Sequence, residues 1–281
     1  MLRPANHRLI IFALSCCRCL LMVVPLSAES ESLLEVQQIE NPRPFDASAL
    51  SPELANILGA YYEQNYPRVL EWAGLESLRI EGVVVDQRGT TPFIAIRKKP
   101  DLHKVTFEGL GGEQFIYAYD GNEPWQLLPG QKSQPIVMSK AAAADFIRDC
   151  MFGGHLLYPS ASGKTVRLLG TAVFEGIACY RIEVSLDGGQ KIEYALSKYN
   201  SREVYIRYLS HASGSVESVY QGDFESVNGM SIPRSSRLYV DDAFKAEIKI
   251  NRADANTGVM PWMFRRASEY SALLLNPVSD N

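Results

Sequence analysis

The sequence predicts a mainly β protein of the α+β class, in which a curved antiparallel sheet forms an unclosed β-barrel that helices cover on its inner face. From residue 78 onward, about a dozen segments alternate apolar with polar residues, which is the period of a strand. Short turns join successive segments, so neighbouring strands must be antiparallel. Only two regions have helical spacing, and a sheet of so many strands tends to curl, so we expect it to wrap around these helices.

Residues 1–28 have the order of a secretory signal peptide. Arg3 and Arg8 lie at the start, an apolar run follows, and small residues precede the acidic Glu29. We therefore expect export, cleavage near Glu29 and a periplasmic location.

Two alternatives for the N-terminus stay open. The apolar run from Leu9 to Leu26 is about 18 residues long, the lower limit for a membrane-spanning helix, although Arg18 interrupts it. An uncleaved membrane anchor is therefore one alternative. A lipoprotein acylated at Cys16 is the other, because a short lipobox-like segment precedes that cysteine.

Composition and charge restrict the class of protein. The 281 residues are 46% hydrophobic and 21% charged, which is enough apolar material for a globular core. Without residues 1–28 the chain carries 25 basic and 32 acidic residues. Since no cluster of Lys and Arg with interleaved aromatic residues occurs, we expect no nucleic-acid partner.

Two cysteines, Cys150 and Cys179, remain after removal of the signal peptide. An oxidising compartment favours a possible disulfide between them. Periodicity favours two free thiols instead, because Cys150 has helical spacing with core residues, whereas Cys179 alternates with Arg181 on the polar face of its strand.

Helical structure is expected to begin at residue 52, after a flexible acidic lead over residues 29–51. Apolar residues recur at i, i+3, i+4 and i+7 from Leu54 to Tyr61, and again from Tyr66 to Ala73. Pro67 lies between these two stretches, so we expect a kink or a new helix start there.

Five strands are expected next, followed by a helix and seven more strands. The first five are 78–85, 92–98, 103–108, 113–119 and 124–128. The helix is capped by Ser139, runs toward Cys150 and stops before Gly153. The last seven strands are near 164–174, 177–186, 190–197, 202–209, 215–226, 229–240 and 244–252.

Three motifs of the second half resemble the repeating signature of the outer-membrane lipoprotein-sorting, LolA-like proteins. They are Leu169 to Val184, Tyr220 to Phe224 and Val227 to Pro233, and Arg97 to Asp101 is similar to an early hairpin of that family. The resemblance covers about residues 52–266. It implies a half-barrel domain over 52–267, followed by a C-terminal tail over 268–281.

The same resemblance implies a function without catalysis. It implies that the protein is a carrier or receptor whose hydrophobic cavity binds a lipid or the acyl chains of a lipoprotein. A role in lipoprotein sorting is included in this expectation. An envelope protein-binding or sensory module is the alternative, and a secreted hydrolase is less favoured. Because His103, His155 and His211 lie in separate segments, we expect no metal site. Gln114 stands where a dinucleotide-binding motif would need its third glycine, so we expect no cofactor.

Aromatic residues of the N-terminal half are candidates for the ligand-binding surface. Phe115, Tyr117 and Tyr119 share one side of their strand, Phe93 lies on a neighbouring strand, and Trp125 lies on the next. The alternative is that these rings simply pack as core beneath the helices.

Overall fold

The computed structural model describes residues 46–109, 111–128, 134–187 and 189–266. The signal peptide predicted over residues 1–28, with its anchor and lipoprotein alternatives, and the tail predicted over 268–281 lie outside these described residues. Within them, the end of the predicted lead forms a turn, in which the Leu50 N–H donates to the Ala47 carbonyl at 3.0 Å. The side chain of Leu50 packs against the core.

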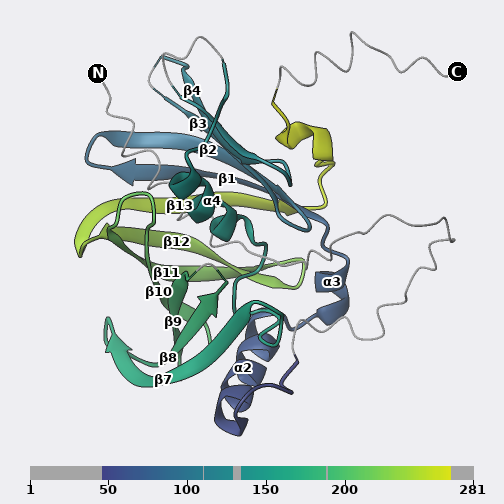
Figure 1. The fold of residues 1–281 in the computed structure, drawn as a ribbon, viewed down its shortest axis with the longest axis vertical. Coiled ribbons are helices and arrows are strands. Elements are labelled where there is room, and N and C mark those ends of the chain that lie inside the picture. Colours follow the sequence, from purple (N-terminus) through teal and green to yellow (C-terminus); the bar gives the residue numbers. More distant parts are fainter. Residues whose placement is uncertain (1–45, 110, 129–133, 188, 267–281) are drawn as a thin grey trace, which may run out of the picture.

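Among the described residues, one antiparallel sheet of thirteen strands dominates the structure, and it does not close into a barrel (Figure 1). The predicted fold class is confirmed. The strands are β1 (Ser77–Asp86), β2 (Gly89–Lys98), β3 (Leu102–Glu108), β4 (Gln114–Tyr119), β5 (Pro124–Leu127), β6 (Ile136–Val137), β7 (Lys164–Phe174), β8 (Ile177–Leu186), β9 (Lys191–Ser197), β10 (Glu203–Leu209), β11 (Val216–Val227), β12 (Met230–Val240) and β13 (Ala243–Ala255).

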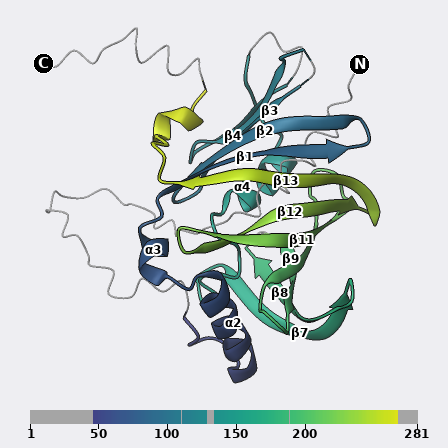
Figure 2. The same ribbon diagram turned by 180° about the vertical axis from the view of Figure 1, so that it is seen from behind.

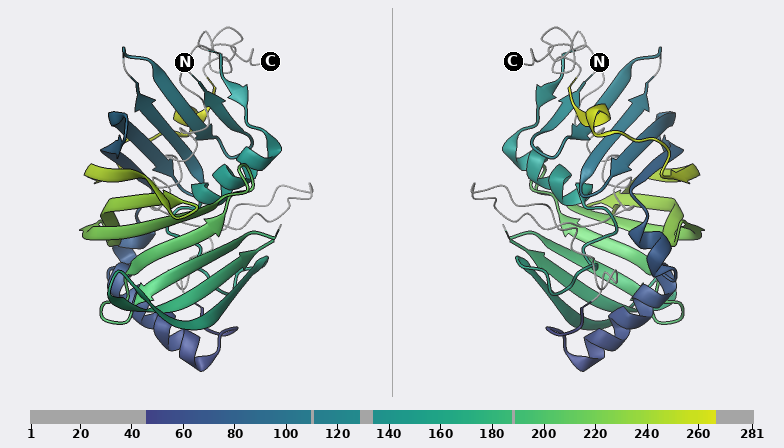
Figure 3. Two further views of the ribbon diagram at one scale, coloured as in Figure 1. Left: turned by 90° about the vertical axis from the view of Figure 1, so that its left-hand side faces the viewer. Right: turned by 90° about the vertical axis from the view of Figure 1, so that its right-hand side faces the viewer.

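The strand order requires the chain between the two edge strands to cross from one edge of the sheet to the other. Every neighbour in the sheet is also a neighbour in the chain, except that β1 pairs with β13 and joins the two halves. The two edge strands are therefore β6 and β7, which follow one another in the sequence. The chain between them carries α4 (Lys140–Cys150), and Figure 3 shows this helix on the concave side of the curved sheet.

The helices begin where their sequences predict. Ser51 caps α2 (Pro52–Asn65) and accepts from the Leu54 N–H at 3.4 Å, while Ser139 caps α4 in the same way. Beyond Pro67, α3 (Val69–Ala73) is a separate helix, so the predicted new start is confirmed. Two elements were not predicted: the two-residue strand β6, and a 3-10 helix η1 (Pro261–Phe264).

A single apolar core joins α2, α4 and the inner face of the sheet. It includes Leu58 and Tyr61 of α2, Phe146 of α4 and inward residues of both halves of the sheet, such as Ile80 and Tyr194. Figure 2 shows the opposite side, where strands β11, β12 and β13 lie in front of α4.

The polar environment predicted for Cys179 is wrong. Its side chain is fully buried in a second, smaller apolar cluster with Ala195 and Tyr205, on the outer face of the sheet. The reason is that Phe174 and Tyr220 pack against this cluster and exclude water from a face expected to be wet. Cys150 belongs to the main core, so the possible bridge is not formed and both cysteines are buried free thiols.

Candidate functional site

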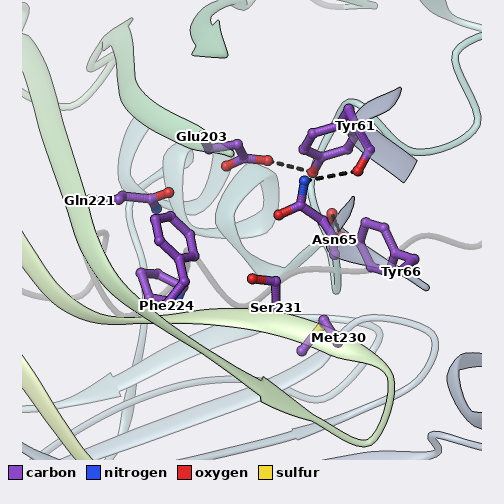
Figure 4. Close-up of a pocket in the computed structure, with 10 residues that line it drawn as sticks. Tyr61, Asn65, Tyr66, Glu203, Gln221, Phe224, Met230 and Ser231 are labelled. Atoms are coloured by element: carbon purple, nitrogen blue, oxygen red, sulfur yellow. Dashed lines mark hydrogen bonds between the residues drawn. The ribbon is translucent and has the colours of Figure 1, made fainter. Parts of the chain in front are cut away.

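A small pocket lies where the C-terminal end of α2 meets β10, β11 and β12 (Figure 4). Its free volume is about 20 Å³, enough for about one water molecule. Polar and apolar residues share its wall: Tyr61, Asn65, Tyr66, Gly153, Glu203, Gln221, Phe224, Met230, Ser231 and Pro233.

Hydrogen bonds between α2 and the strand region hold one side of this pocket. The Tyr61 hydroxyl donates to Glu203 Oε1 at 2.6 Å, and Asn65 Nδ2 donates to the Ser201 carbonyl at 3.0 Å. Burial, followed by the Glu203 carboxylate, holds the pKa of Tyr61 well above its ordinary value. The phenol therefore stays protonated and remains a donor to the carboxylate.

Two buried donors on the opposite wall have no hydrogen-bond partner. They are Nε2 of Gln221 on β11 and the hydroxyl of Ser231 on β12. In Figure 4 both side chains extend toward the space that Glu203 and Asn65 face from the other side. A buried donor without a partner costs free energy, so this wall is arranged to receive an acceptor or a water molecule.

The β11–β12 turn fixes this wall against α3. Asn228 Nδ2 donates to the Glu71 carbonyl at 3.0 Å. Gly229 has φ of 76°, and a Cβ there would lie 2.9 Å from the Arg68 carbonyl oxygen. Glycine is therefore required both by the backbone conformation and by the close packing.

Both motifs that flank this turn contribute to the pocket. Gln221 and Phe224 come from the motif Tyr220 to Phe224, while Met230, Ser231 and Pro233 come from the motif Val227 to Pro233. In the sequence, these residues indicate only the fold. The polar residues Gln221 and Ser231, which are half-buried in the structure, were the signal in each motif that could have indicated a site.

The aromatic residues predicted to bind ligand are buried in the structure. Phe93, Phe115, Tyr117 and Trp125 are each at most 3% exposed, and Tyr119 is 9% exposed. All but Trp125 belong to the main core, and the Trp125 Nε1 donates to the Phe264 carbonyl at 2.8 Å. None of the five residues lines the pocket. In the structure they pack as core residues, which is the alternative interpretation of the sequence.

A second buried polar cluster lies beneath α4. Arg97 is fully buried, and its Nη2 donates to the carbonyl of Asp149 in α4 at 2.8 Å. His103 pairs with Arg97 across β2 and β3, and its ring stacks on Phe146 of α4 with centroids 5.4 Å apart. Both ring nitrogens of His103 are buried without a hydrogen-bond partner. Burial, followed by Arg97, holds the pKa of His103 well below its ordinary value.

Arg148 ties the same helix to the sheet. Its guanidinium bonds Asp149 at 2.8 Å and lies 4.0 Å from the ring centroid of Tyr208 on β10. The Tyr208 hydroxyl in turn donates to Glu217 Oε2 on β11 at 2.6 Å. Thus α4 is held by a buried network of charged and aromatic groups, as well as by apolar packing.

The described ranges contain neither a candidate metal site nor a membrane-spanning helix. No group of three or more His, Cys, Asp and Glu residues there could hold a metal ion. Among the helices of that part of the chain, none is long and apolar enough to span a membrane.

Comparison with known proteins identifies the class of fold. The sequence matches no protein-family model and no curated protein. The fold is nevertheless similar to those of solved proteins from the LolA superfamily and the DUF1329 family. A LolA superfamily protein from Nitrosomonas europaea is similar over 76% of this chain and 97% of its own, with 14% identity and a TM-score of 0.51. A DUF1329 family protein from Desulfovibrio piger is similar over 75% of this chain and 98% of its own, with 15% identity and a TM-score of 0.53.

Proposed function

We propose that the protein is a non-enzymatic periplasmic binding protein that carries or receives a lipid or the acyl chains of a lipoprotein. The single observation that carries this proposal is the continuous apolar core between the concave face of the sheet and the inner sides of α2 and α4. The similarity of the fold to that of a LolA superfamily protein also supports the proposal.

An acyl chain can enter this core only if a helix moves. The described pocket has about 20 Å³, far less than an acyl chain needs. The apolar surface beneath α2 and α4 would contact the acyl chain in place of the displaced helix. This replacement is feasible because burial of apolar surface is non-directional. The cost includes the polar contacts of each helix, such as Tyr61 with Glu203 and Arg97 with Asp149, at roughly 1 kcal/mol net each.

Uptake of a fluorescent fatty acid by the mature protein tests the proposal. We expect saturable binding together with faster amide hydrogen exchange in α2 or α4, because the helix is displaced. Absence of saturable binding, and of lipid in native mass spectrometry of the purified protein, would contradict it.

A matched pair of variants in α4 locates the binding surface. Phe146 points into the core and is 4% exposed, whereas its neighbour Ile147 is 41% exposed. Phe146→Ala leaves a cavity under the helix. It should raise fatty-acid affinity, because engineered apolar cavities bind apolar ligands. Ile147→Ala should leave the affinity as in the wild type. Equal behaviour of both variants would place the ligand elsewhere.

The outer face of the sheet favours a second function, binding of an envelope protein. Phe174, Tyr205, Tyr220, Tyr239 and Phe244 form a row of ring contacts, with successive centroids 4.5 to 5.7 Å apart. Phe244 is 44% exposed. Since aromatic residues are enriched at protein interfaces, this row is a candidate contact surface. If the wild type captures an envelope protein, Phe244→Ser should abolish this capture and leave lipid uptake unchanged. That result would separate this function from the first.

A further inference from the structure

We propose that residues 29–41 of the same chain dock along the free edge of β7 as a fourteenth, antiparallel strand of the sheet. This inference goes beyond the proposed function, because it assigns an interaction surface at the edge of the sheet. The two edge strands among the described residues are β6 and β7. Strand β6 has two residues, whereas β7 has eleven, and Figure 1 shows β7 at one border of the sheet.

The free edge of β7 presents backbone groups and exposed side chains to a further strand. On one side β7 pairs with β8, and within the described part of the chain no strand pairs with its other side. Its second row of N–H and C=O groups is therefore open to another extended segment. No side chain of β7 is buried, and Val173 is 68% exposed. A further strand would complete both the hydrogen bonding and the burial of this edge.

The described chain begins beside the start of β7. The Ser160 hydroxyl donates to the Asp46 carbonyl at 2.9 Å, and Ser160 lies four residues before β7 begins at Lys164. A segment that precedes Asp46 and follows this edge therefore runs from the Phe174 end of β7 toward Lys164. That direction is antiparallel to β7, which is also how the neighbouring strands β8 and β9 are paired.

The length and the proline positions of the segment match the edge. Residues 29–41 are thirteen residues without proline or glycine, and β7 has eleven residues. At about 3.3 Å per residue, a strand of this length spans about 36 Å, so the segment can follow the whole edge. Pro42 and Pro44 come next. Because proline cannot donate to a strand ladder, the pairing ends there, and four residues remain to reach Asp46.

Apolar residues of the segment fit the concave side of this edge. In an extended strand, Leu34 and Val36 share one face. On β7, Val166 and Leu168 likewise share a face, and both pack against the main core. Placed side by side, the two pairs extend the apolar core to the new edge.

The charges favour this segment over a second copy of the chain. Residues 29–41 contain four glutamates and no basic residue, whereas β7 contains Lys164 and Arg167 and no acidic residue. The Arg167 side chain is still 60% exposed, although it pairs with Glu183 at 2.9 Å. Opposite charges stabilise neighbouring strands, and a second β7 would instead bring like charges to the same edge.

Hydrogen exchange at the backbone amides of β7 in the mature wild type tests the inference. We expect protection along both sides of β7, comparable with that of β8. In Val36→Pro/Gln37→Pro, the amides on the free edge should exchange about tenfold faster. Successive N–H groups of a strand point to opposite sides, so one of the two prolines removes a donor to β7. Arg43→Pro is the matched control, because it adds a proline outside the expected strand, and it should keep the wild-type protection.

The outcomes identify the occupant of the edge. Unprotected free-edge amides in the wild type would overturn the inference. Protection that survives in Val36→Pro/Gln37→Pro would also overturn it, and a dimer in light scattering would then identify a second copy as the occupant. Unchanged exchange in β1 and α4 shows that each variant is folded. Because no lipid is present, these results do not depend on the proposed function.

Discussion

Acid should destabilise this protein through His103. The imidazole is fully buried between Arg97 and the ring of Phe146, and neither nitrogen has a hydrogen-bond partner. Its pKa in the folded protein is held well below the ordinary value, first by burial and then by Arg97. As the pH falls below about 6.5, the unfolded chain takes up a proton at His103 that the folded chain refuses. The free energy of unfolding therefore decreases with falling pH in this window.

The size of this pH dependence follows from the uptake of one proton at His103. Each pH unit below about 6.5 should lower the free energy of unfolding by about 1.4 kcal/mol, until the folded pKa is reached. Between pH 6.5 and pH 5 this amounts to about 2 kcal/mol, or a fall of about 4–8 °C in Tm for a domain of this size. Because His103 contacts Phe146, the loss should be felt first in α4.

Urea unfolding of the mature wild type and of His103→Phe, at pH 7, 6 and 5, measures this contribution. The difference between the two proteins isolates His103, since Asp101 and Glu217, whose raised pKa values act in the opposite direction, are present in both. We expect the wild type to lose about 2 kcal/mol more than the variant between pH 7 and pH 5. The exposed His211 is the control, and His211→Phe should follow the wild type. Parallel pH profiles for wild type and His103→Phe would refute the reasoning.

Three further predictions test the helix contact, the core and the thiols. Tyr61→Phe removes the hydrogen bond to Glu203 and should lower the free energy of unfolding in urea by about 1–2 kcal/mol. It should also raise the fatty-acid affinity, because α2 is held less firmly. Unchanged affinity would show that α2 stays in place. Tyr117→Ala should lower the free energy of unfolding by about 3–5 kcal/mol, as expected for a buried aromatic ring. A variant with wild-type stability and weakened fatty-acid uptake would instead show that Tyr117 belongs to the ligand-binding surface. Cys150 and Cys179 should resist a maleimide in the native protein and should both react after denaturation without reductant; a failure to react then would show a disulfide.

Local patterns were sufficient to predict most of the elements. The alternation of Tyr180, Ile182 and Val184 predicts a strand from neighbouring residues alone, and the structure has β8 there. Ser139 and Pro67 mark helix starts through their own backbone chemistry, which requires no distant partner. Strand β6 was missed because two residues are too few to show a period.

The sequence by itself determined the class of fold, because strand period and turn spacing are local properties of the chain. Only the tertiary structure decided that β1 pairs with β13, which joins the two halves of the sheet, and that Phe93 and Tyr117 belong to one common core. It alone also brought Gln221 and Ser231 to one pocket against Tyr61, more than a hundred residues away in the chain. The physical reason is that burial and hydrogen-bond satisfaction depend on which distant residues surround a side chain, and a periodic pattern carries no information about those neighbours.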